Sequence, residues 1–126
     1  MAARSSIGKR QTTNTTAAAS LVTLMSVDVP TFDGLAFSNS CVYVYYTLTW
    51  NKSGVGGGTI LTHAVAQLSS GSLGTPSTNS TVTIGSGPPT VTVTQVGTTI
   101  RYNITPADAT STTWLLVARF HLYDPV

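Results

Sequence analysis

The sequence predicts an all-β protein, an antiparallel β-sandwich of about seven strands for which a jelly-roll arrangement is one option. Hydrophobic residues make up 41% of the 126 residues, which is enough for one domain with a core. Charged residues make up only 8%, against a usual share of about 25%. The chain has no glutamate, but it has 23 threonines and 14 serines. Threonine is β-branched and suits the exposed face of a strand, so this composition favours sheets over helices.

Alternation of apolar and polar residues predicts where the strands lie. The clearest run is 42–50, where Val42, Val44, Tyr46, Leu48 and Trp50 share one face. Turn residues separate this run from six others, predicted at 21–29, 59–69, 80–84, 90–94, 100–104 and 113–123.

The links between the last three predicted strands are short, so we expect these strands to pair as an antiparallel meander. Trp50 and Trp114 fall on apolar faces and predict a core between two sheets, and Tyr102 is expected to face it. Phe32 and Phe37 lie in a predicted loop and are expected to be exposed.

Residues 1–20 form a polar segment in front of the sandwich domain, residues 21–126. This N-terminal arm carries three cations and no acid, and its one sizeable aliphatic side chain is Ile7. Such a segment cannot bury enough apolar surface to fold alone, so we expect something outside the chain to hold it extended. The predicted partner-binding residues of the arm are Arg4, Ile7, Lys9 and Arg10.

The charge distribution gives the folded body no basic face. The net charge is +2, of which the arm contributes +3 and the remainder of the chain −1. Three dispersed cations make few phosphate contacts, so nucleic acid is not an expected partner.

No pattern of reactive side chains predicts an enzyme, a cofactor or a metal site. His63 and His121 lie in predicted strands on the less apolar face, with no ligand at zinc-type spacing. The acids, Asp28, Asp33, Asp108 and Asp124, are scattered and suit turn or capping roles. Cys41 is the single cysteine, which excludes an intrachain disulfide, and we expect a buried, inert thiol. The sequence shows neither a secretory signal nor an apolar run long enough to span a membrane.

The predicted strands 42–50 and 113–123 carry apolar residues on both faces. One face of each is expected to lie in the core, and the second face needs another surface to cover it. We expect a partner subunit to cover the second face, and a loop or the arm folding back would serve equally. The residues concerned are Tyr43, Tyr45, Leu115, Val117 and Tyr123. The tyrosines could instead form a platform for sugars, which would make the chain a carbohydrate-binding module.

The C-terminal third resembles a pattern in small structural proteins of tailed bacteriophages. A Thr/Val strand over 90–96 turns at Gly97 into a second strand, and a short loop leads to Thr113 and Trp114 at the start of the last strand. An arm followed by a sandwich also resembles capsid decoration, or cement, proteins. These resemblances imply a non-enzymatic virion protein, assembled in the host cytoplasm, that forms a dimer or trimer.

The resulting hypothesis is a decoration protein that binds the major capsid protein or other virion subunits through its arm and one sandwich face. A tail, baseplate or fibre component is the alternative within the same class.

Overall fold

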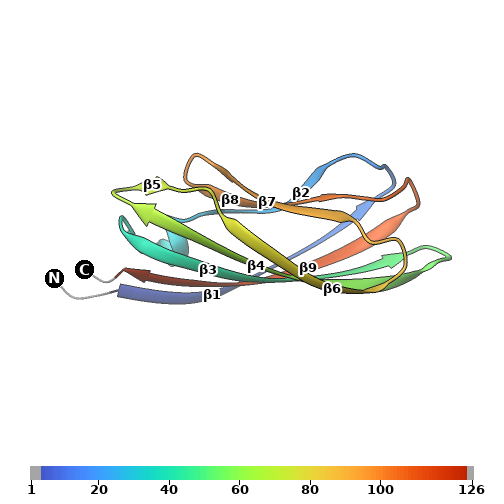
Figure 1. Cartoon of the computed structure of the whole chain (residues 1–126), viewed down its shortest axis with the longest axis horizontal. Helices are drawn as coiled ribbons and strands as arrows, with labels where there is room; N and C mark the ends of the chain where they lie inside the picture. The colour runs from blue at the N-terminus through green and yellow to red at the C-terminus, as the bar shows by residue number, and fades with distance from the viewer. Residues whose placement is uncertain (1–3, 125–126) are drawn as a thin grey trace.

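The structure, a computed structural model, describes residues 4–124 and leaves aside the side chains of residues 4–5 and 81–83. Two antiparallel sheets face each other, as Figure 1 shows, and confirm the predicted all-β sandwich. Within the described residues the helical element is one 3-10 turn, η1 (Phe32–Gly34). The strands are β1 (Arg4–Thr16), β2 (Val22–Asp28), β3 (Ser40–Lys52), β4 (Gly56–Ser69), β5 (Ser72–Leu73), β6 (Ser77–Gly85), β7 (Thr90–Val96), β8 (Thr99–Thr105) and β9 (Thr112–Asp124).

The larger sheet has six strands in the order β1-β9-β3-β4-β5, with β6 also paired to β4. The smaller sheet has the order β2-β8-β7 and covers the inner face of the larger one (Figure 1). Strands β3 and β9 lie at the centre of the large sheet, with Trp50 opposite Trp114 and Val44 opposite Phe120. Along both strands, buried positions alternate with exposed or half-buried ones.

The inward side chains of the two sheets form one core. The rings of Trp50 and Trp114 are 6.2 Å apart between centroids, and Trp50 Nε1 donates a hydrogen bond to the carbonyl oxygen of Ser86 at 3.1 Å. Tyr46 of the large sheet packs on Tyr102 of the small sheet at 4.6 Å. The predicted inward positions of both tryptophans and of Tyr102 are therefore confirmed.

The described part of the N-terminal arm is a strand of the chain's own sheet, so the expectation that an outside partner must hold it is wrong. Strand β1 pairs with β9 along its whole length, from Arg4 opposite Asp124 to Thr16 opposite Thr112. The reason is that an edge strand needs few apolar side chains, because its backbone hydrogen bonds and one half-buried face suffice.

The predicted meander of the last three strands is also wrong. Strands β7 and β8 do form a hairpin, and Gly97, with a φ of 60°, occupies the first turn position as in a type II′ turn. The next link, however, carries the chain across the sandwich, and β9 pairs with β1 and β3. Short links permit a change of sheet as readily as a hairpin, so link length alone could not decide between them.

Both loop phenylalanines are buried, contrary to expectation. Phe32 packs on Phe120 at 5.3 Å between ring centroids, and Phe37 is 3% exposed. A side chain at Gly8 of β1 would collide with the Phe32 ring, so the glycine allows this loop to close the end of the core. The strands that the sequence did not predict are β1 and the two-residue β5.

Candidate interaction face

The surface of the large sheet that points away from the core is the candidate functional site, and we call it the outer face. It is built by alternate residues of β1, β9, β3 and β4, because β9, β3 and β4 bury their other residues in the core and the other face of β1 is half-buried. Its principal side chains are Ile7, Lys9, Tyr43, Tyr45, Leu61, His63, Val65, Leu115, Val117, Arg119, His121 and Tyr123.

Large apolar side chains gather on the outer face. Six residues with an exposed fraction of 36–68% belong to it, and no element of the described chain covers them. A monomeric soluble protein seldom exposes so many neighbouring apolar groups unless the surface has a function. These six are Ile7, Tyr45, Leu61, Val65, Leu115 and Tyr123.

Tyrosines and histidines form a ring cluster at the centre of this face. The Tyr45 ring lies 4.6 Å from the rings of Tyr43 and His63 and 5.9 Å from His121. The Tyr43 hydroxyl is also 3.4 Å from His63 Nδ1. Its pKa is raised, first by hydrogen bonding with the Tyr45 side chain and then by burial. The Nε2 atom of His121 is buried and has no hydrogen-bond partner among the described residues.

A shallow pocket of about 510 Å³ opens beside this cluster. It is lined by Tyr45, Thr47, Val117, Arg119 and His121, which come from the central strands β3 and β9. The pocket therefore combines an aromatic ring, an aliphatic group, a cation and a polar ring nitrogen. Such a combination can receive an apolar group of a partner and fix its polar neighbours.

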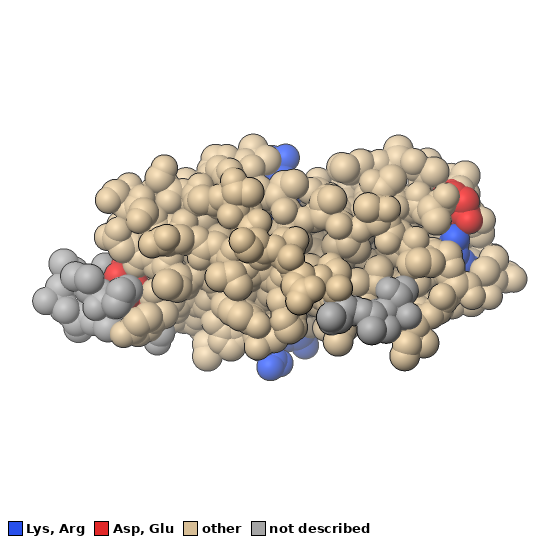
Figure 2. Space-filling model, viewed as in Figure 1, with Lys and Arg blue, Asp and Glu red and all other residues tan. Residues whose placement is uncertain are grey.

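Charged side chains are sparse over the molecule and of one sign on the outer face. Figure 2 shows few coloured atoms, and Lys and Arg atoms project from the lower side, where the large sheet lies in Figure 1. Lys9 of β1 is directly opposite Arg119 of β9. Neither cation forms an ion pair with a described residue. The outer face is thus a positively charged, largely apolar surface.

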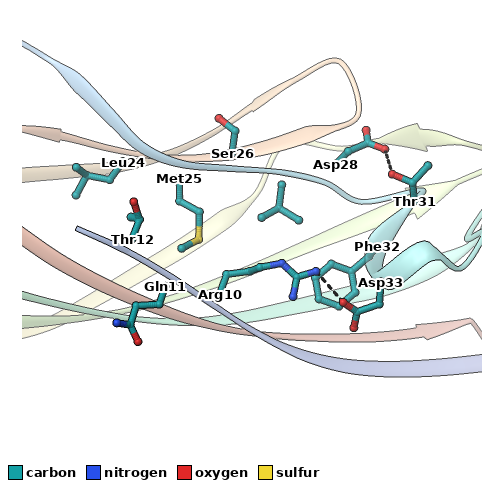
Figure 3. Close-up of a pocket in the computed structure, with 11 residues that line it drawn as sticks. Arg10, Gln11, Thr12, Leu24, Met25, Ser26, Asp28, Thr31, Phe32 and Asp33 are labelled. Atoms are coloured by element: carbon teal, nitrogen blue, oxygen red, sulfur yellow. Dashed lines mark hydrogen bonds and ion pairs between the residues drawn. The ribbon is translucent and has the colours of Figure 1, made fainter. Parts of the chain in front are cut away.

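A second depression, of about 420 Å³, lies between the edge strands β1 and β2 (Figure 3). Arg10 is one of its lining residues, and its guanidinium is 4.5 Å from the centroid of the Phe32 ring. Arg10 also donates a hydrogen bond to Asp33 Oδ1 at 2.7 Å, and the Ser6 hydroxyl donates one to Asp33 Oδ2 at 3.0 Å. Arg10 is the main cause of a lowered Asp33 pKa. These contacts hold β1 onto η1, so this groove is explained by the packing of the chain itself.

The residues predicted as partner-binding divide between these two places. Ile7 and Lys9 lie on the outer face with Tyr43, Tyr45, Leu115, Val117 and Tyr123, whereas Arg10 turns to Asp33. The Arg4 side chain lies outside the described residues. Whether any of them binds a partner stays a prediction.

Sequence reasoning missed the contribution of β4 to this face. His63, Leu61 and Val65 are joined to Tyr43 and Tyr45 by the register of β3 and β4. The alternation of apolar and polar residues over 59–69 already placed these three residues on the second face of a strand. Alternation does not show which strands pair, so it could not place them beside Tyr43 and Tyr45.

Cys41 lies on the outer face opposite Tyr123 and is exposed, so the prediction of a buried thiol is wrong. Because Val42 points into the core, its neighbour must point outward.

No three His, Cys, Asp or Glu side chains of the described residues lie close enough to share a metal ion. No helix in residues 4–124 is long and apolar enough to cross a membrane.

Comparison with known proteins relates this fold to a phage protein. No model of a known family matches the chain, and no curated protein sequence matches it. Among solved structures, the tailspike protein of Acinetobacter baumannii phage AM24 is similar, with a TM-score of 0.52 and 12% identity. The match covers 98% of this chain and 26% of the tailspike, so the chain spans about a quarter of that protein's length. At this identity, the likeness concerns the fold of a β-sandwich that a phage tailspike also contains.

Proposed function

We propose that this chain is a non-enzymatic structural component of a bacteriophage particle, held in its assembly through the outer face. The observation that carries the proposal is the group of six exposed, large apolar side chains on one uncovered sheet. The likeness in fold to a phage tailspike supports a place in the tail rather than on the capsid. This replaces capsid decoration, the first hypothesis from the sequence, with its tail-associated alternative.

The chemistry of the outer face suits contact with another protein. Protein interfaces are enriched in tyrosine, other aromatic residues and arginine, and their centres are depleted in lysine and acids. The centre of this face has Tyr43, Tyr45 and Arg119 side by side, with aliphatic groups around them. A few such anchors dominate the affinity of most interfaces, and Tyr45 beside the pocket is the candidate for this role.

The expected homo-oligomer is part of the proposal. Virion subunits are commonly cyclic oligomers, and a dimer or a trimer of this chain would bring several outer faces into one assembly. Its mass in solution, measured by light scattering during size-exclusion chromatography, tests this point separately.

The location is tested on particles of the phage that encodes the chain. Purified particles are separated into tails and capsids, and the chain is quantified in each fraction by mass spectrometry. We expect it in the tails. Its presence only in capsids would favour decoration instead, and its absence from both fractions would overturn the proposed function.

The role of the outer face is tested by a matched pair of variants in the same particles. Val65 on β4 is 47% exposed, and Val96 on β7, away from this face, is 49% exposed. Val65→Asp should reduce incorporation of the chain, because a carboxylate would enter an apolar contact, whereas Val96→Asp should not. Equal incorporation of both variants would contradict the use of this face.

A further inference from the structure

We propose that the partner of the outer face is an acidic protein surface, whose carboxylates meet Lys9 and Arg119 while its apolar groups cover Tyr45 and Val117. This inference rests on the proposed function and adds the chemistry of the partner to it. The outer face carries two cations that no ion pair among the described residues balances.

The two cations occupy neighbouring positions on adjacent strands. Lys9 is opposite Arg119, Arg119 is opposite Tyr45, and Tyr45 is opposite His63, which forms one row across β1, β9, β3 and β4. Like charges directly opposite each other destabilise a sheet. The free chain therefore bears a cost that a carboxylate placed between Lys9 and Arg119 would remove.

The chain's own acids lie elsewhere. Asp28 and Asp33 lie at the groove between β1 and β2, and Asp108 pairs with Lys52 at 2.8 Å in the loop before β9. Asp124 is 3% exposed and has interactions of its own. No carboxylate among the described residues belongs to the outer face, and carboxylates of a partner would supply the compensating charge.

A second copy of the chain fits this face less well than an acidic partner. Two outer faces stacked about a two-fold axis present the same patch to each other. A second copy brings no described carboxylate to this face, so Lys9 and Arg119 would stay uncompensated, and an axis through their row would place cations against cations. Apolar area alone would allow such a dimer, but the charge disfavours it.

Carbodiimide cross-linking of intact tails tests the inference, because the chain has only two lysines. Lys52 is buried, at 3% side-chain exposure, whereas Lys9 lies on the outer face. The reagent joins an amine directly to a carboxylate, so a link at Lys9 reports an acid within contact distance. We expect the tryptic peptide 5–10 to be linked through Lys9 to an Asp or Glu of another tail protein.

A second measurement uses charge reversal with a matched control. Arg119→Glu should lower the content of the chain in tails by about tenfold or more, since it repels the same carboxylates. Arg101→Glu makes the same change in β8, outside the outer face, and should leave the content unchanged. Raising the salt concentration should release the wild-type chain from isolated tails, because ionic contacts at an interface are screened.

Several outcomes would overturn the inference while leaving the proposed function intact. These are a chain present in tails with Lys9 unlinked, a Lys9 link to a second copy or to an acidic glycan, and normal incorporation of Arg119→Glu. A dimer of the purified chain that Tyr45→Ala dissociates would also contradict it. Absence of the chain from the particles would instead overturn the proposed function, and the inference with it.

Discussion

The indole Nε1 of Trp114 donates a hydrogen bond to Oγ1 of Thr16 at 2.9 Å. Trp114 is 1% exposed near the start of β9, and Thr16 is the last residue of β1. A buried indole N–H requires an acceptor, and here the N-terminal strand supplies it. The bond therefore fixes the end of β1 against the core.

Thr16→Val should destabilise the protein by about 1–3 kcal/mol, because it leaves a buried donor without an acceptor. Urea unfolding followed by tryptophan fluorescence measures the change in the free energy of unfolding. Thr15→Val is the control, since Thr15 is exposed and its change should stay within about 0.5 kcal/mol. Similar values for both variants would argue against a stabilising role for the Thr16 hydroxyl.

Arg10 and Asp33 should show a small but measurable coupling. Their side chains are 36% and 34% exposed, so solvent screens the ion pair and we expect about 0.5–1 kcal/mol. A double-mutant cycle of Arg10→Ala and Asp33→Ala, with unfolding free energies for all four proteins, isolates this term. Strictly additive effects would mean that Arg10 holds β1 through the Phe32 ring alone.

The sandwich was predictable because alternation is a local property of the sequence. Each of the strands from β3 to β9 longer than two residues carries it, and the burial of Trp50, Trp114 and Tyr102 follows directly. Strand β1 escaped prediction because its composition is that of a disordered tail. Its order depends on β9, about a hundred residues away, which no local pattern reports.

The outer face was predictable only in part, because a local pattern shows which residues share a face of one strand but not which strands lie side by side. Tyr43, Tyr45, Leu115 and Val117 stood out as apolar residues on the second face of a strand. Their assembly with Lys9, His63 and Arg119 depends on strand order and register, which are tertiary properties. The expected meander would have removed β9 from this face.

Gly58→Ala should be strongly destabilising, although the residue lies in a strand where alanine is normally tolerated. A Cβ at Gly58 would collide with the carbonyl oxygen of Ile84 and with the Trp50 ring. We expect a loss of about 1–3 kcal/mol, measured by thermal or urea unfolding. Gly74→Ala is the control, because its Cβ would meet only Gln67 O at 3.5 Å. Equal stability of the two variants would mean that the Trp50 packing tolerates a methyl group.

The thiol of Cys41 should react readily in the folded chain. It is exposed on the outer face, so an aromatic disulfide reagent should modify it at a similar rate with and without urea. A buried comparison is Ala64→Cys in a Cys41→Ser background, since position 64 is 1% exposed and should react only on unfolding. Protection of Cys41 in the free chain would contradict the orientation of this face.

Asp108→Asn should destabilise the protein at neutral pH and have no effect in strong acid. Asp108 Oδ2 accepts a hydrogen bond from Lys52 Nζ at 2.8 Å, and Oδ1 accepts one from the Thr110 amide at 3.0 Å. These bonds, that of Lys52 first, lower the pKa of Asp108 from 3.8 to about 2.

A folded-state pKa below the unfolded value means that this stabilisation is complete above the unfolded pKa of 3.8 and is lost as the pH falls through about 2. The difference in melting temperature between wild type and Asp108→Asn should therefore be constant at neutral pH and shrink across that acid range. Ala109→Ser, an uncharged change in the same exposed loop, should differ from wild type by the same amount at every pH. A wild-type advantage over Asp108→Asn that persisted below this range would show that shape rather than charge makes the contact, because the carboxyl would then be protonated.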